Sequence, residues 1–190
     1  MLKRYSALLL GLVAATQLTA CFPLVVAGTT TGVVVAQDRR ASAVILNDKQ
    51  IEKRVGDRIS DKFGDLTHVN ITSYNKVVLL TGEVPDEATR AEAGRMAQET
   101  TDVRQVHNEL IVQLPTSVGS RANDAGITTK VKARMVDANR FSPLHVKVVT
   151  ERKQVYLLGL VKQQEAKDAA EITSQTSGVE KVVTLFEYLD

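Results

Sequence analysis

Apolar positions recur along the chain with two different periods, and the same succession of periods occurs twice. Ile51, Val55 and Ile59 are spaced by four residues, which lines one face of a helix. Alternating apolar residues in segment 77–84 predict a strand. The matching positions, 76 or 77 residues later, are Ile127, Val131, Met135 and segment 155–161. The sequence therefore predicts an internal duplication.

Each copy is expected to run helix, strand, strand, helix, strand. Segments 69–74 and 77–84 flank Asn75-Lys76, which predicts a hairpin turn. A proline and two acids at 85–87 favour the start of a second helix. Gly82 and Gly159 occupy matched strand positions, where a missing Cβ allows the alanine-rich second helix to lie close. We expect an α/β (α+β) fold with two tandem αββαβ domains, each a three-stranded mixed sheet with two helices packed on it.

The duplication divides the chain into five segments. A stretch of turn-forming residues, 114–120, separates the two copies and predicts a linker. The predicted segments are a signal peptide at 1–20, a tether at 21–46, a first domain at 47–114, a linker at 115–123 and a second domain at 124–190.

The N-terminus holds the chain's single cysteine, Cys21. Such a thiol can be a buried small residue, a nucleophile or an attachment point. Upstream, Lys3 and Arg4 precede an apolar run at 7–15 that is too short to span a bilayer, which is typical of a signal peptide. A thiol at a cleavage point has no fixed base to activate it. These features favour an attachment point.

The order Leu18-Thr-Ala-Cys21 resembles the lipobox of bacterial lipoproteins. This resemblance implies that the Cys21 sulfur receives a diacylglycerol and that the signal is removed in front of it. The residue after the cysteine is Phe22 rather than an aspartate that retains lipoproteins in the inner membrane. By resemblance, the expected location is the outer membrane, lipid-anchored and facing the periplasm.

Charge and composition disfavour nucleic acid as a partner. The chain has 24 basic and 22 acidic residues and no tryptophan. Removing Lys3 and Arg4 with the signal leaves 22 basic residues (24 − 2) against 22 acidic ones. A nucleic-acid binder normally shows a basic surplus and stacking aromatics.

The sequence offers no recognisable catalytic or cofactor motif. His68, His107 and His145 are isolated along the chain, without the spacing of a metal site. A nucleophile elbow and a phosphate-binding loop are also missing. We therefore expect no enzyme activity, no metal and no cofactor.

The repeat itself resembles a known family. The strand signature Val-x-Leu-x-Gly-x-Val, with the closing segment 178–182, is similar to the BON domain. Two such domains behind a lipobox resemble the dual-BON outer-membrane lipoproteins of the DolP family. That resemblance implies anionic phospholipid binding through the second domain, enrichment at the division site and support of the outer-membrane barrier.

The first helix of the second copy is the candidate lipid site. Basic residues there flank an apolar stripe, an arrangement that can grip a membrane surface. In the other interpretation the stripe is core and the helix is solvated, because the first copy carries similar basic residues at Lys53, Arg54 and Arg58. The candidate residues are Gly126, Ile127, Thr128, Lys130, Lys132 and Arg134; Gly126 stands where the related proteins carry a bulky aromatic.

A second function stays open beside lipid binding. One BON domain can dock an envelope protein, such as assembly or division machinery, with the lipid serving only as an address. Charge reversal on the 127–135 helix separates the two hypotheses, since it affects vesicle binding in one and protein capture in the other.

Overall fold

The computed structural model describes residues 38–189, and residues 37–190 form one compact unit. The predicted signal peptide, Cys21 and most of the predicted tether lie outside the described residues. The first domain comprises α3 (Ser42–Phe63), η2 (Gly64–Leu66), β1 (His68–Tyr74), β2 (Val77–Val84), α4 (Glu87–Gln98), β3 (Gln105–Asn108) and β4 (Ile111–Val112). The second comprises α5 (Val118–Ala138), η3 (Pro143–His145), β5 (Val146–Glu151), β6 (Gln154–Val161), α6 (Gln163–Ser174) and β7 (Lys181–Tyr188).

The strand order confirms the predicted α+β class. Strand β2 is central in its sheet, antiparallel to β1 and parallel to β3, and β6 is likewise antiparallel to β5 and parallel to β7. Within the described chain, the third strand of the first sheet is split into β3 and β4, both paired with β2. At the break, the Asn108 side chain accepts a hydrogen bond from the Leu110 N–H, and Leu110 turns into the core.

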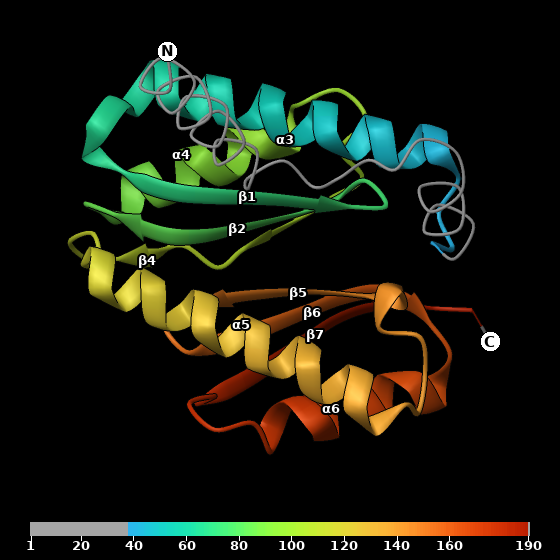
Figure 1. Cartoon of the computed structure of the whole chain (residues 1–190). Helices are drawn as coiled ribbons and strands as arrows, with labels where there is room; N and C mark the ends of the chain where they lie inside the picture. The colour runs from blue at the N-terminus through green and yellow to red at the C-terminus, as the bar shows by residue number, and fades with distance from the viewer. Residues whose placement is uncertain (1–37, 190) are drawn as a thin grey trace, which may run out of the picture. The chain divides into compact units, whose positions relative to one another are not determined.

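The helices pack their apolar stripes on the outer faces of the sheets (Figure 1). Ile51 and Val55 of α3 are fully buried in the first core, and Val131 and Met135 of α5 in the second. The stripe of each first helix is therefore core, as the four-residue spacing predicts.

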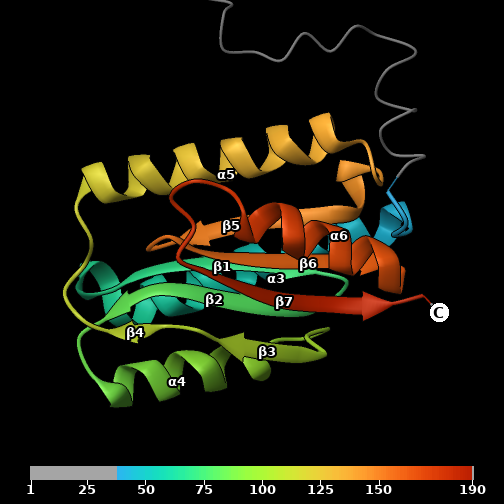
Figure 2. The same cartoon turned by 90° about the horizontal axis from the view of Figure 1, so that it is seen from below.

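The two sheets also pack against each other, with the helices on their far sides (Figure 1). Figure 2 views this stack from below, with α6 in front of the strands and α3 behind them. Tyr74 and Leu79 of the first domain share a buried cluster with Tyr156 and Leu158 of the second. Both faces of β2 are buried for this reason, and its pattern differs from the strict alternation predicted for 77–84.

Two buried aspartates hold the hairpin turns of the two domains. Asn75 and Lys76 both have positive φ, and the Asp48 carboxylate accepts a hydrogen bond from each of their N–H groups, at 2.8 Å. Asp124 does the same for the positive-φ turn of the second domain, at 2.8 and 2.9 Å. These bonds compensate a conformation that residues with side chains seldom adopt.

The structure adds three local details to the elements that the sequence predicts. Helix α3 starts at Ser42, within the predicted tether 21–46, and α5 starts at Val118, within the predicted linker 115–123. Ser117 caps the N-terminus of α5, since its Oγ accepts a hydrogen bond from the Ser120 N–H. The close approach at Gly82 is to the backbone of the neighbouring strand, because an added Cβ would lie 1.9 Å from the His68 carbonyl oxygen.

Candidate functional site

Helix α5 places most of the predicted lipid-binding residues on the surface. Gly126, Lys130 and Lys132 are exposed, and a side chain added at Gly126 would meet open space. Thr128 is half-buried and donates a hydrogen bond to the Thr150 hydroxyl, at 2.7 Å. Ile127 is only 1% exposed and lies in the core, so its side chain is not available to a membrane.

Arg134 has a structural partner. Its guanidinium donates to the Gln175 carbonyl oxygen and lies 3.5 Å from the Thr176 hydroxyl, at the end of α6. Arg58, 76 residues earlier, donates to the Met96 carbonyl oxygen and to the Thr100 hydroxyl at the end of α4. Because the same hydrogen-bonded contact occurs in both domains, Arg134 is a structural residue that joins α5 to the end of α6. Its guanidinium is therefore less available to a ligand.

The two matched helices differ in how their charges are compensated. Each basic residue of α3 forms an ion pair with an acid; these residues are Lys49, Lys53, Arg54, Arg58 and Lys62. Among the described residues, none of the four basic residues of α5 has an acidic partner within ion-pair distance; these are Arg121, Lys130, Lys132 and Arg134. In the first domain Arg54 pairs with Asp102; the residues at the matched positions of the second domain are Lys130 and Gly178, so the acid is missing there.

Small and neutral residues surround the uncompensated lysines. Ala122, Ala125, Thr129 and Ala133 are exposed on α5, and Val136 is 61% exposed. The acidic residues of α5 are the buried Asp124 and the exposed Asp137 near its end. This face therefore combines positive charge with side chains that lose little by leaving water.

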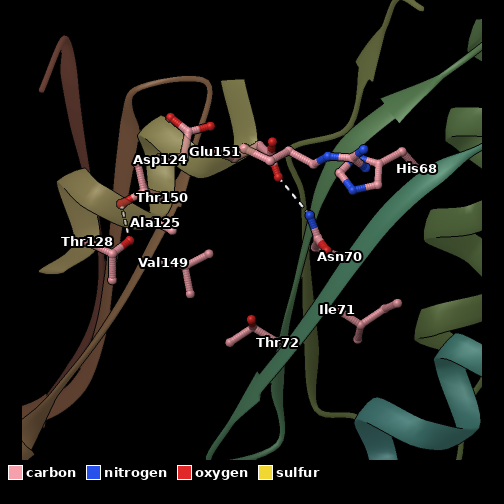
Figure 3. Close-up of a pocket in the computed structure, with 11 residues that line it drawn as sticks. His68, Asn70, Ile71, Thr72, Asp124, Ala125, Thr128, Val149, Thr150 and Glu151 are labelled. Carbon is pink, nitrogen blue, oxygen red and sulfur yellow. Dashed lines mark hydrogen bonds between the residues drawn. The ribbon is translucent and has the colours of Figure 1, made fainter. Parts of the chain in front are cut away.

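A cleft of about 400 Å³ lies beside α5, between the two domains (Figure 3). Thr128 and Asp124 line it from α5, Thr150 and Glu151 from β5, and His68 from β1. Burial is the main cause that raises the pKa of the Glu151 carboxyl above its usual range, and the nearby Glu83 adds to it.

His68 is isolated along the sequence but not in the folded structure. Its Nδ1 lies 3.0 Å from the Glu83 carboxylate, and the ligand atoms of His68, Glu83 and Glu151 all lie within 4.8 Å of one another. Sequence reasoning missed this group because its members are distant in the chain and belong to both domains. His145 likewise lies 3.3 Å from the Glu165 carboxylate.

Comparison with known proteins decides the family. The BON domain matches residues 47–113 and 123–190. The chain is 36% identical over 176 residues to the outer membrane lipoprotein DolP of Haemophilus influenzae, covering 91% of each chain. The chain is a dual-BON protein of the DolP family. It is also 29% identical to a 21 kDa hemolysin of Actinobacillus pleuropneumoniae, over 80% of this chain and 79% of that one.

Membership in the DolP family supports a location in the cell envelope. The osmotically-inducible protein Y of Escherichia coli is another relative, 33% identical over 61% of this chain and 59% of that protein. Within residues 38–189, no helix is both long and apolar enough to cross a membrane.

Proposed function

We propose that this DolP-family chain is a non-enzymatic outer-membrane lipoprotein, anchored through Cys21 and facing the periplasm, that binds anionic phospholipid through α5. Through this contact it supports outer-membrane integrity at the division site. The observation that carries the proposal is the contrast between the two duplicated helices. All the basic residues of α3 are neutralised by acids, whereas those of α5 have no acidic partner in the described structure.

The expected strength of the contact is modest. Near an anionic surface each Lys or Arg contributes about 1 kcal/mol, so Lys130 and Lys132 together contribute about 2 kcal/mol. A free protein would dissociate readily. An anchor at Cys21 raises the effective concentration of the membrane to about millimolar, which lets a weak contact stay occupied. The anchor and the helix therefore depend on each other.

The test uses the lipidated full chain, reconstituted in vesicles of neutral phospholipid with or without an anionic one. With Cys21 blocked by its lipid, an Ala133→Cys substitution on α5 gives one site for an environment-sensitive dye. We expect the dye to report a less polar environment on anionic vesicles than on neutral ones. The difference should shrink as salt is raised from about 0.05 to about 0.5 M.

A charge reversal on α5 supplies the matched comparison. Lys130→Glu with Lys132→Glu should reduce the occupied fraction at least tenfold, whereas Lys49→Glu with Lys53→Glu on α3 makes the same charge change and should leave it intact. Equal responses from the two pairs would contradict the proposal. Loss of an envelope protein from pull-downs with K130E/K132E, at unchanged vesicle contact, would favour the alternative function as a protein-docking module.

A further inference from the structure

Two buried carboxylates and a histidine meet where the two domains are in contact. Glu83 of β2 is fully buried and Glu151 of β5 is 6% exposed. His68 of β1 joins them, so that each of the three side chains comes from a different strand. Asn70 donates a hydrogen bond to the Glu151 carboxylate, at 2.8 Å (Figure 3).

The duplication provides an internal reference for this cluster. A shift of 77 residues maps Glu83 onto Leu160, and Tyr74 onto Glu151. At the opposite end of the domain contact, Leu160 and Tyr74 meet, and the Leu160 N–H donates to the Tyr74 hydroxyl at 3.4 Å. An uncharged pair, Tyr74 and Leu160, thus occupies the positions that match Glu151 and Glu83. Packing of the two domains therefore does not require buried acids at these positions.

The negative charge at this end is only partly compensated. Within the described chain, no Lys or Arg lies within ion-pair distance of Glu151. The Glu83 carboxylate lies 3.0 Å from His68 Nδ1 and 3.5 Å from the Arg152 guanidinium. The cleft-lining Asp124 adds a further negative charge near Glu151, and Arg121, which lines the same cleft, supplies one positive charge. Burying a carboxylate without a cation costs several kcal/mol, so this end of the interface favours an added positive charge.

The geometry of the three side chains suits one kind of cation. In a tetrahedral zinc site with bonds of about 2.0–2.2 Å, neighbouring ligand atoms are about 3.3 Å apart. His68 Nδ1 and Glu83 Oε2 are 3.0 Å apart, and all three ligand atoms lie within 4.8 Å. A side-chain rotation of Glu151 therefore completes a three-ligand set, and one imidazole with two carboxylates matches the preference of Zn²⁺.

We propose that His68, Glu83 and Glu151 bind a divalent transition-metal ion of the zinc type between the two BON domains. The adjoining cleft, which His68 and Glu151 both line, gives the ion a path from solvent and room for a water as fourth ligand. Because His68 and Glu83 belong to the first domain and Glu151 to the second, the bound ion links the domains. It thereby fixes the cleft wall that α5 supplies through Asp124 and Thr128.

The test is a titration of ZnCl₂ into the untagged full-length protein in detergent, followed by calorimetry and thermal unfolding. We expect one equivalent of Zn²⁺ to bind. At about a hundredfold excess over Kd, Tm should rise by about 5 °C or more, since the ion binds the folded state alone. Mg²⁺ should have a much smaller effect, because it prefers six oxygen ligands.

Three variants make the result specific. Glu151→Gln keeps an acceptor for Asn70 and removes the buried charge, so it should fold with a Tm at or above that of the parent and lose the Zn²⁺ response. His68→Ala should weaken binding at least tenfold. His145→Ala, at the matched position of the other end, should retain the full response. A parent protein that binds no Zn²⁺, or an E151Q protein that keeps the shift, would overturn the proposal.

Discussion

At the scale of single residues, two buried aspartates explain how non-glycine hairpin turns are tolerated. Asp48 and Asp124 occupy matched positions, one helical turn before the first core residue of α3 and α5. Each carboxylate accepts hydrogen bonds from the N–H groups of the two turn residues that have positive φ. The signal was present in the sequence, because the pair Asn-Asp at 47–48 recurs at 123–124 in phase with the apolar stripe.

Asp124→Ala should therefore destabilise the protein by about 3 kcal/mol. Two hydrogen bonds to a charged group are lost, each worth about 1.5–3 kcal/mol, and the turn at Arg152 and Lys153 keeps its unfavourable φ. Urea unfolding measures the change. Asp137→Ala, an exposed acid of the same helix, is the control and should cost less than about 0.5 kcal/mol. Equal effects of the two substitutions would show that the turn does not need its carboxylate.

At the scale of elements, periodicity predicted what one helix or strand determines by itself. The spacing of Ile51, Val55 and Ile59 predicted a helix and its buried face, and both are confirmed. The sequence did not predict the helix start at Val118, because serine, which caps the helix at Ser117, is also a common turn residue. In α5, the sequence pattern proposed both Ile127 and Lys130 as lipid contacts, because they belong to the same short motif. The structure separates them, since Ile127 lies in the core and Lys130 is exposed.

At the scale of the whole molecule, the contact between the two sheets was beyond sequence reasoning. The cluster around Tyr74 and Tyr156 joins residues 82 positions apart (156 − 74), and its pairing depends on how two separately folded layers meet. Burial at this contact raises the pKa of the Tyr156 hydroxyl to about 12. The grouping of His68 with Glu83 and Glu151 depends on the same contact.

The segment before α3 is also fixed to the second domain. The Arg39 guanidinium forms a bidentate ion pair with the Glu165 carboxylate, with N···O distances of 2.6 and 2.8 Å. It also donates a hydrogen bond to the Leu160 carbonyl oxygen. The hydrogen bonds from Arg39 are the main cause that holds the pKa of Glu165 at about 2, below its ordinary value of 4.5. Because the folded-state pKa is the lower one, the stabilisation is complete above pH 4.5 and is lost as the pH falls toward about 2.

Arg39→Ala should thus lower the free energy of unfolding by about 1 kcal/mol at pH 7, since the pair is partly exposed. The difference between the parent and the variant should narrow between pH 4.5 and about 2. Urea unfolding across this range tests the expectation. A difference that stays constant with pH would mean that Arg39 acts through packing rather than through the Glu165 charge.

We expect α5, and not the first domain, to meet phospholipid. The most direct measurement places a photo-crosslinking amino acid at Ala133 on α5, or at the exposed Gln98 of α4, in the lipidated protein in its native membrane. We expect phospholipid adducts from position 133 at several times the yield from position 98, and a loss of these adducts when Lys130 and Lys132 are changed to Glu. Equal yields from the two positions, or adducts of position 133 with protein alone, would contradict this expectation.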